Sequence, residues 1–192
     1  IPDSREATRQ ALREAAEGAD LIISAGGVSV GEEDHVRPAV EAEGQIALWR
    51  VAIKPGRPLA YGRVGRHGPE GARAAVPGSF AHFIGLPGNP VSAYVTFLLF
   101  VRPFVLRLQG IQAVEPQAVT LISGFDWTNP DRRREFLRAV HLPDGRLGLF
   151  RQQGSAVLTS AVVGHGLIDN PPGQTIRQGD AVRFLSFAEL LN

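Results

Sequence analysis

Three cations lie close together in the segment WRVAIKPGRP, which begins at Trp49: Arg50, Lys54 and Arg57. In a β-strand, Arg50 and Lys54 would share one face because side chains alternate with a period of two. The two prolines of the segment restrict the backbone and so fix where Lys54 and Arg57 point. Like charges repel unless an anion lies between them. The pattern therefore favours an oxyanion or phosphate site, and a solvated strand face is the alternative.

Two glycine-rich turns, each placed between a predicted strand and a predicted helix, could hold a phosphate-like group. Glycine lets the backbone approach a ligand closely, and free N–H groups at the start of a helix attract anions. Tight chain connection is the simpler alternative for either turn alone. The residues concerned are Gly26, Gly27, Ser29 and Gly31 in the first turn, and Pro87, Gly88, Asn89 and Pro90 in the second.

A carboxylate near the first turn could bind a metal. Asp34 follows the first turn, and a carboxylate beside an anion site can hold Mg²⁺ against a phosphate. Helix capping is the other interpretation of Asp34. Asp3 has the same ambiguity, since Glu6 lies three residues later as in a capping box. The five histidines show no metal-ligand spacing.

The elements that would position these groups alternate between helix and strand in the first half of the chain. Helices are predicted over residues 3–18, 36–43 and 91–109, and strands over 20–24, 46–53, 59–64 and 82–86. Residues 65–80, rich in Gly, Pro and Ala, are predicted to form a solvated loop. Pro103 is expected to kink the third helix or to mark its last turns. This order predicts an open, doubly wound α/β sheet, with strand 20–24 buried and parallel.

After Gly110 the pattern changes to short alternating runs separated by turn residues. The runs cover residues 119–122, 135–142, 147–151, 156–163 and 181–187, and they predict a small all-β barrel or sandwich. We therefore expect an N-terminally truncated α/β domain over residues 1–110 and a C-terminal β domain over 111–192. The boundary is expected near Gly110–Glu115.

The composition excludes several classes of function. A net charge of +1 gives no reason to expect nucleic acid or an acidic membrane as a partner, and with no cysteine there are no disulfides or thiolate metal sites. The longest apolar run, residues 91–101, is shorter than the ~20 residues of a membrane span. The expected location is the cytoplasm. Because 19 of the 20 basic residues are Arg, the single lysine, Lys54, is conspicuous.

Three motifs in this order, DLIISAGGVSVGEEDH, LWRVAIKPGRPLAYG and GLPGNPVSAYVTF, resemble the MoeA family of molybdopterin molybdenumtransferases. RREFLRA and RQQGSAVLTSAVVGHGLI in the second half are weaker matches. The resemblance implies a homodimer that uses Mg²⁺ and molybdate to insert molybdenum into adenylylated molybdopterin, with release of AMP. A related adenylyltransferase, which lacks the appended β domain, and a non-catalytic scaffold that binds peptides are the alternatives.

The resemblance also implies roles for individual residues. Asp3, Asp34, Arg50, Lys54, Pro87 and Pro90 match active-site positions, and Lys54, Arg57, Ser92, Arg133 and Ser155 match a molybdate pocket. Arg50 and Arg57 stand where the family commonly has lysine, which keeps the charge but alters its geometry. The family's earlier TGDEL-like turn and N-terminal domains are absent, and there is no methionine. We therefore expect a truncated chain that is inactive by itself.

Overall fold

The computed structural model describes residues 1–28, 35–56, 58–66, 79–154 and 158–191. The chain forms two compact units, one made of Ile1–Val51 with Pro58–Gly88 and the other of Ala52–Arg57 with Asn89–Asn192. In this division the long helix after Asn89 packs with the second unit. Tyr94 on that helix, for example, makes an edge-to-face contact with Phe187 at a centroid distance of 5.5 Å.

The first unit contains a four-stranded mixed sheet with the order β1-β5-β4-β2. β1 (Leu21–Ala25) runs parallel to β5 (Phe80–Leu86). β4 (Pro58–Gly65) is antiparallel to both β5 and β2 (Gly44–Arg50). The predicted α/β class is confirmed, but only one strand pair is parallel.

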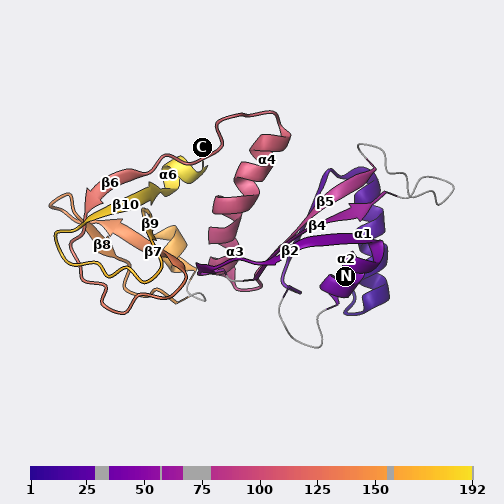
Figure 1. Ribbon diagram of the computed structural model, residues 1–192, viewed down its shortest axis with the longest axis horizontal. Coiled ribbons are helices and arrows are strands. Elements are labelled where there is room, and N and C mark those ends of the chain that lie inside the picture. The colour runs from indigo at the N-terminus through magenta and orange to yellow at the C-terminus, as the bar shows by residue number, and fades with distance from the viewer. Residues whose placement is uncertain (29–34, 57, 67–78, 155–157, 192) are drawn as a thin grey trace. The chain divides into compact units, whose positions relative to one another are not determined.

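Both helices of the first unit cover one face of this sheet (Figure 1). α1 (Arg5–Gly18) and α2 (Val36–Glu43) pack against each other and against β4. The buried side chains of this layer come from both helices, the central strands and the turn after β1, and they are Leu12, Ala16, Val28, Ala39, Val40, Ala60, Val64, Ala81 and Phe83. α2 has the bounds that the sequence predicts, with Gly44 after its last residue.

Two sequence expectations about the first unit are wrong. β1 was expected to be buried, but Ile23 is 45% exposed, and among the described strands β1 lies at an edge of the sheet beside β5. The N-cap of α1 is Ser4 rather than Asp3. Ser4 has extended backbone angles, and its Oγ accepts a hydrogen bond from the Ala7 N–H at 3.2 Å.

The long apolar helix consists of α3 (Pro90–Thr96), a π-helical segment η1 (Phe97–Val101) and α4 (Arg102–Leu108). The helix does not end at Pro103. Just before this proline the hydrogen bonding changes, since the Arg102 N–H bonds to the Phe97 carbonyl, and the helix then continues as α4. By length and composition this 19-residue stretch could cross a membrane. One such helix is weak support for a membrane span, because core helices of soluble proteins share these properties.

The second unit has a six-stranded sheet with the order β3-β7-β9-β10-β6, and β8 pairs with β7. The strands are β3 (Ile53–Lys54), β6 (Val119–Ile122), β7 (Arg134–His141), β8 (Leu147–Leu149), β9 (Gly166–Asn170) and β10 (Ala181–Ser186). All pairs are antiparallel except β3 with β7. Across the described part of this unit the strands do not close into a barrel, although Ser123 forms a single bridge to Leu147.

Three elements of the second unit differ from the sequence expectations. The predicted strand 156–163 is in part a short helix, α5 (Thr159–Val162), which buries Ser160 and leaves Val162 exposed. β9, the fully buried central strand, was not predicted because its apolar run is short and flanked by glycine. The C-terminal end of the expected strand 181–187 turns into α6 (Phe187–Leu191).

The predicted strand 46–53 is also wrong, because it is two strands that belong to different sheets. β2 ends at Arg50 in the first unit, and β3 begins at Ile53 in the second. The Ala52 carbonyl accepts a hydrogen bond from the Arg134 N–H at 3.1 Å, which draws the chain onto β7. Arg50 and Lys54 therefore do not share the face of one strand.

Candidate functional site

The two glycine-rich turns meet at the carboxyl ends of β1 and β5, as the sequence predicts. Because these strands are parallel neighbours, the turns that follow them leave the same edge of the sheet. The Gly26 N–H bonds to the Leu86 carbonyl at 3.0 Å, and a side chain on Gly88 would lie 3.5 Å from the Gly26 Cα atom. Gly26 and Gly27 have φ values of +87° and +68°, which favour glycine.

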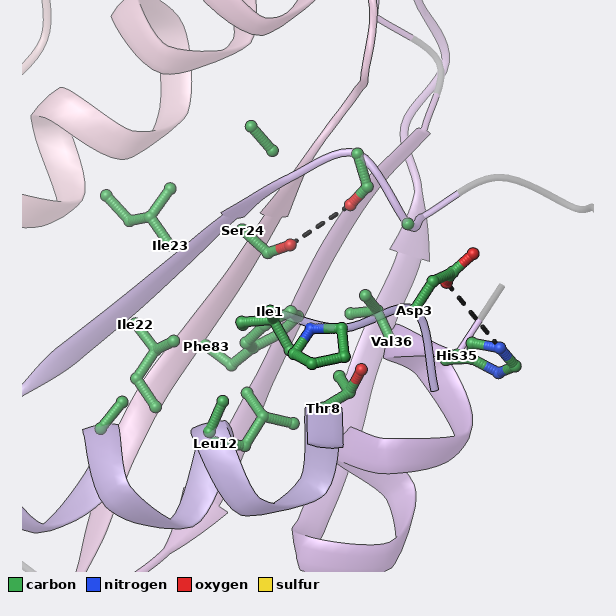
Figure 2. Close-up of a pocket in the computed structure, with 16 residues that line it drawn as sticks. Ile1, Asp3, Thr8, Leu12, Ile22, Ile23, Ser24, His35, Val36 and Phe83 are labelled. Carbon is green, nitrogen blue, oxygen red and sulfur yellow. Dashed lines mark hydrogen bonds and ion pairs between the residues drawn. The ribbon is translucent and has the colours of Figure 1, made fainter. Parts of the chain in front are cut away.

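A cavity of about 690 Å³ opens beside the first turn (Figure 2). Its walls come from the segment before α1, from α1 itself, from β1 and from the start of α2. They are mostly apolar, with Leu12, Ile22, Val36 and Phe83 among them, and a few polar groups stand at one end. This size and lining are typical of a small-molecule site.

Asp3 lies at the polar end of this cavity (Figure 2). Its Oδ1 is 3.8 Å from His35 Nε2, and its side chain is 93% exposed. Because Ser4 caps α1, the capping explanation of Asp3 no longer holds, and its exposed carboxylate lies at the rim of the cavity beside His35. A single carboxylate fits the way proteins bind Mg²⁺, which takes most of its ligands from phosphate and water.

The second turn contains a buried oxygen with unsatisfied hydrogen-bonding capacity. Pro87 is buried, whereas Gly88 and Pro90 are exposed. Asn89 precedes α3 but makes no side-chain capping bond, and its buried Oδ1 has no hydrogen-bond partner within the described part of the chain. Such orphan acceptors are uncommon in folded proteins and are often explained by a missing ligand or water.

Five predicted site residues lie outside the described residues. They are Ser29, Gly31 and Asp34 after β1, Arg57 after the KPG segment, and Ser155 before α5.

Lys54 is held by two carboxylates of the second unit. The parallel register of β3 and β7 places Lys54 beside Glu135, and Lys54 Nζ lies 3.3 Å from Glu135 Oε1. Lys54 Nζ also lies 3.5 Å from Asp131 Oδ2. The lysine side chain is 44% exposed, so its ammonium group can be reached from solvent.

Glu135 is fully buried and is fixed from three sides. Its Oε2 accepts hydrogen bonds from Trp127 Nε1 at 2.8 Å and from Asn170 Nδ2 at 3.4 Å, while Oε1 faces Lys54. A buried carboxylate is tolerated only with such partners. Glu135 therefore provides a rigid support for the ammonium group of Lys54.

Arg133 reaches the same place from the loop before β7. Asp131 Oδ1 accepts from the Arg133 backbone N–H and Nε, at 3.0 and 2.9 Å, and Oδ2 accepts from Nη2 at 2.8 Å. Hydrogen bonds from Arg133 hold the pKa of Asp131 well below its usual range, and Lys54 adds to this effect. Arg133 Nη1 points to the Ile53 carbonyl at 3.5 Å, next to Lys54.

Ser92 lies where the turn after Lys54 packs on the long helix. A side chain on Gly56 would come within 2.5 Å of Thr96 Cγ2 and 3.5 Å of the Ser92 carbonyl oxygen, so glycine allows this close approach. Gly56 also has a φ of +114°. Ser92 is 5% exposed. The structure thus brings together Lys54, Arg133 and the first turn of α3, whereas Arg50 belongs to the first unit.

Four residues of this site were not singled out from the sequence: Asp131, Glu135, Trp127 and Asn170. One signal was available, because Glu135 stands beside the apolar pair Phe136 and Leu137 in a predicted strand. Trp127 and Asn170 carried no such signal, since their role depends on contacts between distant segments.

Comparison with known families matches almost the whole chain in two parts. Residues 1–107 match the family model described as "Probable molybdopterin binding domain". Residues 120–187 match the model described as "MoeA C-terminal region (domain IV)".

Individual relatives agree with this assignment. A molybdopterin molybdenumtransferase of Haemophilus influenzae is 43% identical over 110 residues, which are 57% of this chain and 24% of that protein. The molybdenum cofactor synthesis protein cinnamon of Drosophila melanogaster is 34% identical over 183 residues, covering 91% of this chain and 28% of that protein. The chain therefore spans about a quarter of the length of these two relatives.

Solved structures show the same fold. A molybdenum cofactor biosynthesis protein from Pyrococcus furiosus has a TM-score of 0.70 at 22% identity, over 97% of this chain and 56% of that one. A molybdopterin biosynthesis MoeA protein from Pyrococcus horikoshii has a TM-score of 0.68 at 21% identity, over 97% and 40%. The chain therefore belongs to the family of probable molybdopterin-binding domains through residues 1–107, and residues 120–187 form a MoeA C-terminal region.

Proposed function

We propose that the protein acts in molybdenum cofactor biosynthesis as a molybdopterin molybdenumtransferase. It would transfer molybdenum from molybdate to adenylylated molybdopterin and release AMP. The observation that carries this proposal is the pair of cations, Lys54 and Arg133, which contact one and the same carboxylate oxygen of Asp131. Two cations that converge on one oxygen are suited to a tetrahedral oxyanion such as molybdate.

The match to the MoeA C-terminal region favours this reaction over adenylyl transfer, since the resemblance places the appended β domain only in the molybdenumtransferases. Several relatives are named molybdopterin molybdenumtransferase. A scaffold that only binds peptides would not need the cations Lys54 and Arg133, the buried carboxylate of Glu135 beneath Lys54, or the cavity of the first unit.

In this account each unit contributes its own groups. The cavity beside Gly26 and Gly27 would hold the pterin nucleotide, with apolar walls against the ring and turn amides near the phosphates. Asp3, together with Asp34, would hold Mg²⁺, which would neutralise phosphate charge when bound. Lys54 and Arg133 would bind and orient molybdate, with Arg57, Ser92 and Ser155 completing that site.

The further properties that the resemblance implies also remain proposals. They are a homodimer, a cytoplasmic location, and small-molecule substrates without nucleic acid or membrane partners. Arg50 is proposed as a further active-site residue, independent of Lys54.

The direct test is release of AMP from adenylylated molybdopterin in the presence of molybdate and Mg²⁺, using the longest protein that contains this chain. We expect molybdate-dependent AMP release that Lys54→Ala lowers by at least tenfold. Glu41→Ala, an exposed change on α2, should leave the rate unaltered. AMP release that does not depend on molybdate or on Lys54 would contradict the proposal.

A further inference from the structure

Asp131 occupies the position that a bound oxyanion would need. Its Oδ2 lies 2.8 Å from Arg133 Nη2 and 3.5 Å from Lys54 Nζ, so one oxygen bridges both cations. Its Oδ1 accepts two more hydrogen bonds from Arg133. An oxygen of a tetrahedral anion would seek the same contacts.

The charges of the four described residues at this position cancel. Lys54 and Arg133 are positive, while Asp131 and Glu135 are negative, so each cation already faces a carboxylate that an incoming anion must compete with. Glu135 is buried beneath Lys54 and tied to Trp127 and Asn170, so it cannot move aside without losing these bonds. Asp131, in contrast, is 22% exposed and lies in a loop before β7.

We propose that Asp131 is an internal competitor that occupies the oxyanion position of Lys54 and Arg133 and must be displaced when the oxyanion binds. This inference rests on the proposed function, because it assumes that these two cations hold molybdate. Asp131 would then determine specificity. A doubly charged tetrahedral anion gains enough from both cations to replace the carboxylate, whereas weakly binding monovalent anions do not.

The chain offers a matched control for removing this charge. Asp144 and Arg146 repeat the local geometry at a hairpin turn: the Arg146 N–H bonds to Asp144 Oδ1 at 3.1 Å, and Arg146 Nε bonds to Oδ2 at 2.7 Å. Asp144 thus forms the same pair two residues apart, but on a different turn, between β7 and β8.

The experiment compares molybdate binding by the wild-type chain, Asp131→Asn and Asp144→Asn, using isothermal titration at low and high salt. Asparagine retains the Oδ1 acceptor for the Arg133 backbone N–H, so the turn should be preserved. We expect Asp131→Asn to bind molybdate about tenfold more tightly than wild type at low salt, because one repulsive charge is lost. The difference should shrink at high salt, and Asp144→Asn should bind like wild type.

Two further variants separate the failure of this inference from that of the proposed function. If Lys54→Ala and Arg133→Ala lose molybdate binding but Asp131→Asn binds equally or less tightly than wild type, the competitor role of Asp131 is wrong and the oxyanion site stands. If no variant with a native circular dichroism spectrum binds molybdate, the oxyanion site itself is wrong, and the inference falls with it.

Discussion

The acidic partner of each cation determines whether that cation is placed to bind an anionic ligand. Three consecutive arginines precede or begin β7, and each goes to a different place. Arg133 joins Lys54 through Asp131, whereas Arg134 forms a two-pronged pair with the nearly buried Asp169 at 2.5 and 2.7 Å. Arg132 is exposed. The resemblance pointed to Arg133, but its geometry follows only from the fold.

This separation gives a test with a neighbouring control. Arg133→Ala should weaken molybdate binding by about tenfold or more, because a charge-assisted hydrogen bond contributes roughly 1.5–3 kcal/mol. Arg132→Ala removes the same charge one residue away and should change the affinity less than twofold. Isothermal titration gives the dissociation constants for molybdate. Equal losses of affinity in the two variants would show that only the overall charge affects binding, which would contradict a specific role of Arg133.

Elements are held by a few polar contacts whose energetic effects can be measured. The hydroxyl of Ser4 caps α1, and the exposed Asp3 does not. Ser4→Ala should therefore lower the free energy of unfolding by about 1 kcal/mol, and Asp3→Ala by much less. Urea unfolding followed by circular dichroism measures both. The reverse order would restore Asp3 as the cap and weaken its proposed role in the cavity.

Glu43 joins the two helices of the first unit. Its buried Oε1 accepts from Arg9 Nε at 2.7 Å and from Arg13 Nη1 at 2.9 Å. We expect Glu43→Ala to destabilise the chain by more than a surface pair contributes, because α1 and α2 lose the buried carboxylate that joins them.

Glu41 on the same helix provides the comparison, since its exposed pair with Arg37 lies on the surface. Glu41→Ala should cost less than about 0.5 kcal/mol. A loss of similar size in both variants, measured by urea unfolding, would show that Glu43 does not tie α1 to α2.

Local patterns predicted most elements but not how their strands pair. The sequence predicted α2 with its end at Gly44 and a strand at β4, and the runs of β6 and β10 were visible as alternation. The split between β2 and β3 was not, because it depends on the bond from Arg134 to Ala52, 82 positions away in the chain. The helical turn α5 was missed because the residues 156–163 read equally well as an apolar strand.

At the scale of the whole molecule, each compact unit presents one of the two candidate binding places. The cavity and the turn after β1 belong to the first unit, and the cluster of Lys54 and Arg133 belongs to the second. The family models also match the chain in two parts. The sequence predicted the residue types at both places, but the acidic partners of Lys54 emerged only from the folded second unit.

This arrangement predicts that the two ligands can be affected separately. Mg²⁺ should tighten binding of adenylylated molybdopterin, and Asp3→Asn should remove most of that increment while leaving molybdate affinity within twofold. Lys54→Ala should lower the molybdate affinity and leave the effect of Mg²⁺ on the binding of adenylylated molybdopterin within twofold. Titration of each ligand with and without Mg²⁺ measures both effects, and loss of both affinities in either variant would contradict independent sites.

The most direct test of the central claim uses the fact that Lys54 is the only lysine of the chain. Lysine labelled with ¹³C at the ε-carbon gives one signal from the side chain, which molybdate can be titrated against at constant ionic strength. We predict a saturable shift of this signal with molybdate and none with an equivalent increase of chloride. If the signal does not move at molybdate concentrations that saturate binding measured by calorimetry, Lys54 does not contact the oxyanion, and the proposed site is wrong.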